Sequence, residues 1–175
     1  MKYAVVGFSG GIASGKSSLS SAVSDAIGWP RTSFGGYVRL VAARRGLEPT
    51  REACQRIGEE LIREDARKFC EHVLAQVSWC RGEPLIIDGI RHLQVADLLA
   101  DMVHPSRFVL IFADLPRAER EMRLRSRDGG SRPLEELERH STEAQIADLR
   151  GRADLVVAGD RPLAHAAADV VSFLG

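Results

Sequence analysis

Short apolar segments alternate with amphipathic segments along the whole chain. The apolar segments span residues 3–8, 31–34, 84–87, 107–112 and 155–157, lengths typical of strands buried on both faces. Between them, helices are predicted over about 18–27, 37–45, 92–101 and 116–126, then over a polar segment at 134–149 and after Pro162. The segment 49–79 predicts one long helix or two abutting helices. This alternation predicts a three-layer α/β fold with a five-stranded, mainly parallel sheet and helices on both faces.

The composition fits a single domain spanning residues 1–175. The hydrophobic share of 45% and the charged share of 27% are ordinary for a globular protein. Lys and Arg together number 24, as do Asp and Glu, which argues against non-specific binding to nucleic acid or to a membrane surface. Three cysteines without a CxxC spacing predict neither a disulfide framework nor a zinc site. With no signal peptide or long apolar span in the sequence, we expect a cytoplasmic monomer or homodimer.

The strongest motif follows the first predicted strand. Residues 10–17 read GGIASGKS, which matches the GxxxxGK[ST] phosphate loop in full, between a hydrophobic strand and an amphipathic helix. Glycines let backbone N–H groups turn toward phosphate oxygens, and the helix N-terminus adds positive potential. Lys16 is expected to reach the β- and γ-phosphates from a solvent-facing loop, and the Ser17 hydroxyl to bind Mg²⁺. The residues expected to bind ATP here are Gly10, Gly11, Ala13, Ser14, Gly15, Lys16, Ser17 and Ser18.

An acidic residue ends the third predicted strand, in the segment Leu85 to Arg91. The carboxyl ends of parallel strands are where open α/β sheets bind ligands. Beside a phosphate loop, Asp88 is placed to hold Mg²⁺ directly or through water. Arg91 is placed to engage a substrate phosphate. An Asp in this position also commonly starts a turn after a strand, so the assignment depends on the phosphate loop.

Arginines gather on one face of the helix predicted at 116–126 and just beyond it. Arg120, Arg123 and Arg127 are spaced by three and four residues. A polar break follows at 128–133, and together they suggest a short lid over about 124–134. Lid arginines in a phosphate-transfer enzyme neutralise the transferring group and exclude water, so Arg123 and Arg127 are catalytic candidates. The alternative is a solvated face paired with nearby glutamates.

The chain resembles the nucleoside monophosphate kinase group of P-loop proteins, which includes adenylate kinase and dephospho-CoA kinase, over nearly its whole length. The likeness is closest to small adenylate-kinase-like proteins. It rests on the phosphate loop, residues 33–39 (SFGGYVR), 45–52 (RGLEPTRE) and 87–91 (IDGIR), the RxxRLxxR helix at 120–127, and 153–157 with the turn at Gly159.

This resemblance implies site roles that the residue pattern alone does not. Arg39 would bind the acceptor's phosphate with Arg91 in support, and Arg51 would join them in an acceptor-binding segment at about 33–80. Arg123 and Arg127 would contact the donor or transferring phosphates from the lid. The turn at Gly159 would border the donor adenine.

The resemblance implies an ATP- and Mg²⁺-dependent kinase with a small-molecule nucleotide acceptor, a nucleoside or deoxynucleoside monophosphate. Relatives often carry Asp at the position of Gly36, and hydroxyl-phosphorylating kinases have a catalytic Asp in this region. A phosphate acceptor is already anionic at neutral pH and needs no general base. The absence of an Asp at this position therefore favours a phosphate acceptor over a hydroxyl. Asp88 could still act as a base. The alternatives are a hydroxyl kinase, such as a dephospho-CoA kinase-like enzyme, and an NTPase switch or binding module.

Overall fold

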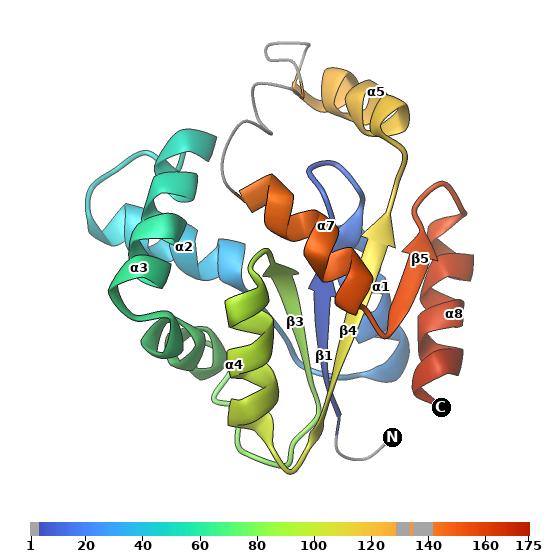
Figure 1. Cartoon of the computed structure of the whole chain (residues 1–175), viewed down its shortest axis with the longest axis horizontal. Coiled ribbons are helices and arrows are strands. Elements are labelled where there is room, and N and C mark those ends of the chain that lie inside the picture. Colours follow the sequence, from blue (N-terminus) through green and yellow to red (C-terminus); the bar gives the residue numbers. More distant parts are fainter. Residues whose placement is uncertain (1–3, 129–133, 135–141) are drawn as a thin grey trace.

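Five parallel strands form one sheet at the centre of the computed structural model, which describes residues 4–128, 134 and 142–175 (Figure 1). Their order is β2-β3-β1-β4-β5, and every pairing is parallel. The strands are β1 (Ala4–Ser9), β2 (Arg31–Ser33), β3 (Leu85–Ile90), β4 (Arg107–Asp114) and β5 (Leu155–Ala158). This arrangement confirms the predicted five-stranded α/β fold.

Helices cover both faces of the sheet, as the alternating pattern predicted. One face packs against α1 (Lys16–Ile27) and α8 (Leu163–Leu174). The other packs against α2 (Phe34–Arg44), α3 (Arg51–Ala75), α4 (Leu93–Val103) and α7 (Thr142–Arg152). Successive strand residues serve the two cores in turn: Val5 faces the α2–α4 side and Val6 faces the α1 and α8 side.

One helix stands apart from these two layers. Helix α5 (Arg117–Asp128) follows β4 beyond the carboxyl end of the sheet (Figure 1). Its Leu124 packs with Ile12 of the phosphate loop and with Leu134 in a small separate cluster. The sheet therefore directs α5 toward the phosphate loop rather than toward either main core.

The long predicted helix consists of two helical segments. Asp65 has extended backbone angles (φ −163°, ψ 93°) inside α3, and its carboxylate accepts a hydrogen bond from the Lys68 N–H at 2.9 Å. That bond caps the second segment, so the two abutting helices are the correct reading. The prediction erred at Phe34, which begins α2 rather than ending β2, because the Ser33 hydroxyl caps that helix by accepting from Gly36 N–H at 2.9 Å.

The predicted helix at 134–149 corresponds to α7, which extends to Arg152; residues 135–141 lie outside the described part of the chain. None of the helices in the described residues combines the length and apolar character needed to cross a membrane.

Candidate active site

The phosphate loop joins β1 to α1 at the carboxyl end of the sheet and has a backbone that only small residues accommodate. Gly10, Ala13 and Gly15 all have positive φ angles, at 149°, 62° and 89°. A Cβ atom at Gly10 would lie 2.6 Å from the Ala113 carbonyl oxygen, too close for any side chain. The loop therefore curls tightly before the N-terminus of α1, which is the geometry that binds phosphate groups.

Two polar side chains of this loop are buried. Lys16 is 9% exposed, and its Nζ lies 3.4 Å from the Gly11 carbonyl oxygen. The expectation that Lys16 faces solvent is therefore wrong: its side chain lies against the loop backbone. The Ser14 hydroxyl is buried and has no hydrogen-bond partner among the described residues. A buried hydroxyl without a partner is costly, and a phosphate oxygen would satisfy it.

Arg31 connects the loop helix to the end of β3. Its Nε donates to the Ser20 Oγ at 2.9 Å, and one terminal NH₂ group donates to the Asp88 Oδ2 at 2.8 Å. The same nitrogen lies 3.5 Å from the Ser17 carbonyl oxygen. One guanidinium therefore holds Asp88 and the first turn of α1 side by side. This role of Arg31 has no signal in the sequence, since only the pairing of β2 with β3 brings it to Asp88.

Ser17 and Asp88, the two expected metal ligands, are neighbours in this arrangement. Asp88 is 5% exposed, and its Oδ1 is buried without a hydrogen-bond partner in the described residues. A hydroxyl and a carboxylate oxygen suit Mg²⁺, which usually takes one or two carboxylates and completes its shell with water and substrate phosphates. The donor set therefore fits the expected ion.

Arginines of α5 lie directly against the phosphate loop. A Cβ at Gly11 would come within 2.7 Å of an Arg120 terminal nitrogen, and one at Gly15 within 3.1 Å of an Arg123 terminal nitrogen. Arg120 also donates to the Ile12 carbonyl at 3.5 Å. The structure thus adds Arg120 to the expected arginines. Arg127 lies in α5 at the edge of the described residues, and most of the expected lid, residues 129–133, is outside them.

A cavity of about 270 Å³ lies between the phosphate loop and the turn after β5. Ser14, Gly15, Ser18 and Gly159, all expected to bind ATP, line it together with Arg123. Arg123 donates to the Gly159 carbonyl at 2.7 Å, which joins α5 to that turn. Below, this space is called the donor cavity.

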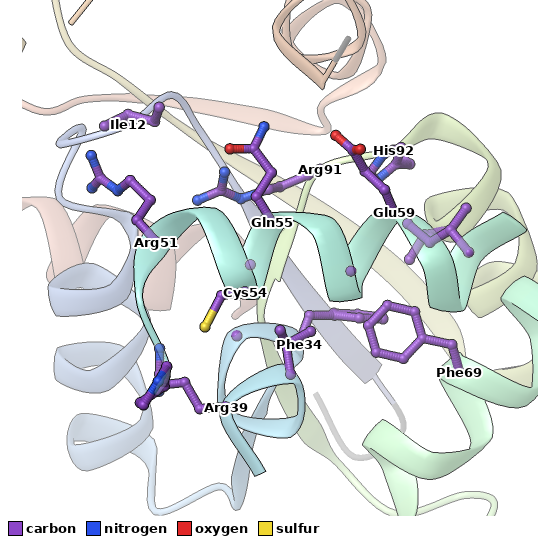
Figure 2. Close-up of a pocket in the computed structure, with 17 residues that line it drawn as sticks. Ile12, Phe34, Arg39, Arg51, Cys54, Gln55, Glu59, Phe69, Arg91 and His92 are labelled. Carbon is purple, nitrogen blue, oxygen red and sulfur yellow. The ribbon is translucent and has the colours of Figure 1, made fainter. Parts of the chain in front are cut away.

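A second cavity, of about 380 Å³, lies between the phosphate loop, α2, α3 and the end of β3 (Figure 2). It brings together all three arginines expected to bind the acceptor: Arg39, Arg51 and Arg91. Phe34 and Phe69 line it as well, with ring centroids 5.0 Å apart in an edge-to-face arrangement. Below, this space is called the acceptor cavity.

Three polar residues of the acceptor cavity were not expected from the sequence: Gln55, Glu59 and His92. The sequence held a signal for Gln55 and Glu59: they follow Arg51 at spacings of four residues, which places all three on one face of a helix. Burial lowers the pKa of His92, and the charge of Arg91 lowers it further, while Glu59 opposes the shift. His92 is therefore neutral at pH 7.

Replacing Arg31 with alanine is expected to lower the free energy of unfolding by about 1–3 kcal/mol, since a buried carboxylate would lose a charge-assisted hydrogen bond. The pair is mostly shielded, with side-chain exposures of 29% for Arg31 and 7% for Asp88. Denaturant unfolding measures the change. Arg45→Ala removes the exposed Arg45–Glu60 ion pair and should have little effect. Equal losses in the two variants would contradict a positioning role for Arg31.

Comparison with known proteins gives both sequence relatives and structural neighbours. No protein-family model matches the chain. The chain is 34% identical over 139 residues to a UPF0200 protein of Aeropyrum pernix, covering 77% of this chain and 70% of that one. It is 33% identical over 124 residues to a UPF0200 protein of Methanothrix thermoacetophila, covering 70% of this chain and 65% of that one.

The structural neighbours are kinases. A shikimate kinase from Aquifex aeolicus superposes with a TM-score of 0.63 at 21% identity, covering 97% of this chain and 95% of that one. A gluconokinase from Sinorhizobium meliloti superposes with a TM-score of 0.60 at 18% identity, covering 99% of this chain and 94% of that one. An APS kinase from Mycobacterium tuberculosis, solved with AMPPNP and APS, superposes with a TM-score of 0.57 at 19% identity. The match covers 99% of this chain and 98% of that one. These likenesses confirm the P-loop kinase fold, and they do not single out adenylate kinase within it.

Proposed function

Since the chain belongs to the UPF0200 family and has the fold of P-loop kinases, we propose that it is an ATP-dependent phosphotransferase whose acceptor is a nucleoside or deoxynucleoside monophosphate. The donor cavity would take ATP, and the acceptor cavity would take the monophosphate. The two cavities border the phosphate loop from different sides, through Ser14 and Gly15 for the donor and Ile12 for the acceptor.

The residues of the loop and of α5 supply positive charge where the phosphoryl group moves. Lys16 would bind the β- and γ-phosphates, and the Ser14 hydroxyl would donate to a phosphate oxygen. Arg120 and Arg123 would neutralise charge from the opposite side of the loop, with Arg127 as a further candidate. Ser17 and Asp88 would hold Mg²⁺, which neutralises charge on the β- and γ-phosphates when bound. Preorganised charge of this kind is commonly the largest catalytic contribution.

The observation that carries the monophosphate assignment is the set of arginines in the acceptor cavity. Arg39, Arg51 and Arg91 come from α2, α3 and the end of β3, three separate parts of the chain. Several guanidinium groups lining one cavity favour an anionic ligand with several oxygens, such as a phosphate. An acceptor phosphate held there would present an anionic oxygen toward the loop and would need no general base.

A hydroxyl acceptor is the second candidate. It is favoured by the unpartnered Oδ1 of Asp88, which could accept the proton of an attacking hydroxyl. Against it, Oδ2 of the same carboxylate already accepts a hydrogen bond from Arg31 at 2.8 Å, which restrains the orientation of the group. A side chain at Gly36, where the base is missing, would also displace the Ser33 hydroxyl, since a Cβ there would lie 2.6 Å from the Ser33 Oγ.

A coupled assay of ADP release tests the proposed function. Purified protein and Mg-ATP are combined in turn with nucleoside monophosphates, deoxynucleoside monophosphates, dephospho-CoA and small alcohols. The proposal expects acceptor-dependent ADP release with at least one monophosphate and little with the hydroxyl compounds. ADP release that no acceptor stimulates would instead indicate an NTPase.

Replacing Arg39 with alanine is expected to raise the KM of the acceptor about ten- to a hundredfold while leaving the KM of ATP nearly unchanged. A charge-assisted hydrogen bond to phosphate contributes about 1.5–3 kcal/mol, which corresponds to that range. Separate titrations of acceptor and ATP measure the two constants. Arg44→Ala, an exposed change on the same helix, is the matched control. Equal effects of the Arg39 change on both substrates would place the acceptor elsewhere.

A further inference from the structure

One carboxylate oxygen in the acceptor cavity has no partner. The Oε1 of Glu59 is buried, and no described residue donates a hydrogen bond to it. Leaving a buried charged acceptor unsatisfied is costly, and a folded protein retains such a group most readily where a ligand satisfies it. Glu59 lines the acceptor cavity, so an acceptor bound there would come within its reach.

Glu59 lies apart from Arg51 and from the guanidinium of Arg91 in this cavity. Figure 2 shows Arg51 and the guanidinium of Arg91 on the side of Ile12, which belongs to the phosphate loop. Glu59 and His92 lie on the opposite side of the view, and Glu59 is near enough to act electrostatically on the His92 ring. The cavity is therefore positively charged near the transferring phosphate and ends in a hydrogen-bond acceptor at the far side.

Other parts of the cavity wall are apolar and partly aromatic. Phe34 and Phe69 are both nearly buried, at 6% and 3% exposed, and Val38 and Ile62 line the same stretch. Such a wall suits a flat, weakly polar ring, because apolar contact and ring stacking stabilise it without further hydrogen bonds. A sugar with hydroxyl groups in every direction would leave several of them unsatisfied against these side chains.

We infer, on the basis of the proposed function, that Glu59 selects the acceptor by accepting hydrogen bonds from N–H groups on the edge of its base. The phosphate would lie at Arg39, Arg51 and Arg91, the ring against Phe34 and Phe69, and the N–H edge at Glu59. The neighbouring His92 ring is neutral, so it does not form an ion pair that would compete with a ligand for the Glu59 carboxylate. The favoured acceptors are then monophosphates whose bases carry an amino group or adjacent N–H donors.

Binding titrations on the intact protein test this role apart from catalysis. AMP, GMP, CMP, UMP and ribose 5-phosphate are titrated calorimetrically into the wild type, Glu59→Met and Glu59→Gln. Met removes the acceptor oxygens at similar size, and Gln keeps one uncharged oxygen. We expect Met to weaken the preferred nucleotide about ten- to a hundredfold and Gln to weaken it less, because charge-assisted hydrogen bonds are the stronger ones. Ribose 5-phosphate, which has no base, should bind all three proteins alike.

Two controls separate recognition from a structural role. Glu60→Met changes the adjacent glutamate, which pairs with Arg45 away from the cavity, and should leave every affinity unchanged. Thermal unfolding of ligand-free Glu59→Met should occur no lower than in the wild type, because the change removes a buried oxygen without a partner. A much lower melting temperature together with weaker binding of ribose 5-phosphate would show a structural role and overturn the inference.

The remaining outcomes distinguish this inference from the kinase proposal. Wild-type affinities in both Glu59 variants, alongside normal phosphoryl transfer to a nucleotide, would overturn base recognition and leave the kinase proposal standing. Nucleotide binding that depends on Glu59 without any transfer would support base recognition and overturn the kinase proposal. If no nucleotide binds more tightly than ribose 5-phosphate, recognition of a base by this cavity is excluded.

Discussion

Replacing Lys16 with alanine is expected to reduce phosphoryl transfer at least about a thousandfold, since an electrostatic contact at a transferring group contributes roughly 4 kcal/mol. Lys16 is 9% exposed and its ammonium lies against the loop backbone, so it is already positioned before ATP arrives. Water that entered in its place would not supply a fixed positive charge. Single-turnover transfer from saturating Mg-ATP measures the loss.

Lys68 provides the matched control for this change, because it is an exposed lysine on α3. Lys68→Ala should transfer phosphate at the wild-type rate. Thermal unfolding should show that Lys16→Ala remains folded, since the tight turn depends on Gly10, Ala13 and Gly15 rather than on the lysine. Normal turnover of Lys16→Ala would mean that the loop does not bind the transferring phosphate.

Asp88→Asn is expected to lower turnover at least about a hundredfold, with a smaller effect on ATP binding. The amide keeps the shape of the carboxylate but loses the charge that would hold Mg²⁺ through Oδ1. It also weakens the ion pair between Oδ2 and Arg31, so some loss of stability is expected. Steady-state rates at saturating Mg-ATP, measured across a range of Mg²⁺ concentrations, give the size of the effect.

The matched control for Asp88 is Asp101→Asn. Asp101 also pairs with an arginine, Arg67, but at an exposed site on α4. Its turnover should equal that of the wild type. If Asp88→Asn changed the rate no more than Asp101→Asn, Asp88 would be a turn residue that serves only to anchor Arg31.

The fold class and the phosphate loop can be predicted from the order of residues alone, because both depend on local signals. A strand buried on both faces needs a continuous apolar run, and a helix on a sheet needs an apolar stripe, so the alternation is visible without coordinates. The loop motif is equally local, since its positive φ angles and its helix N-terminus involve consecutive residues. The position of Asp88 at the end of an apolar strand follows from the same pattern.

The identity of the distant residues that meet at this loop becomes visible only in the folded chain. Parallel pairing of β2 with β3 brings Arg31 to Asp88, across 57 residues of sequence. The path of α5 beyond β4 brings Arg120 to Ile12, across 108 residues. Neither contact has a local signature, because the sequence around an arginine on a strand or helix is the same whether its side chain is solvated or paired. Glu59 is the clearest example: a helical glutamate is ordinary in sequence, and its meaning comes from the burial of one oxygen inside a cavity lined by arginines.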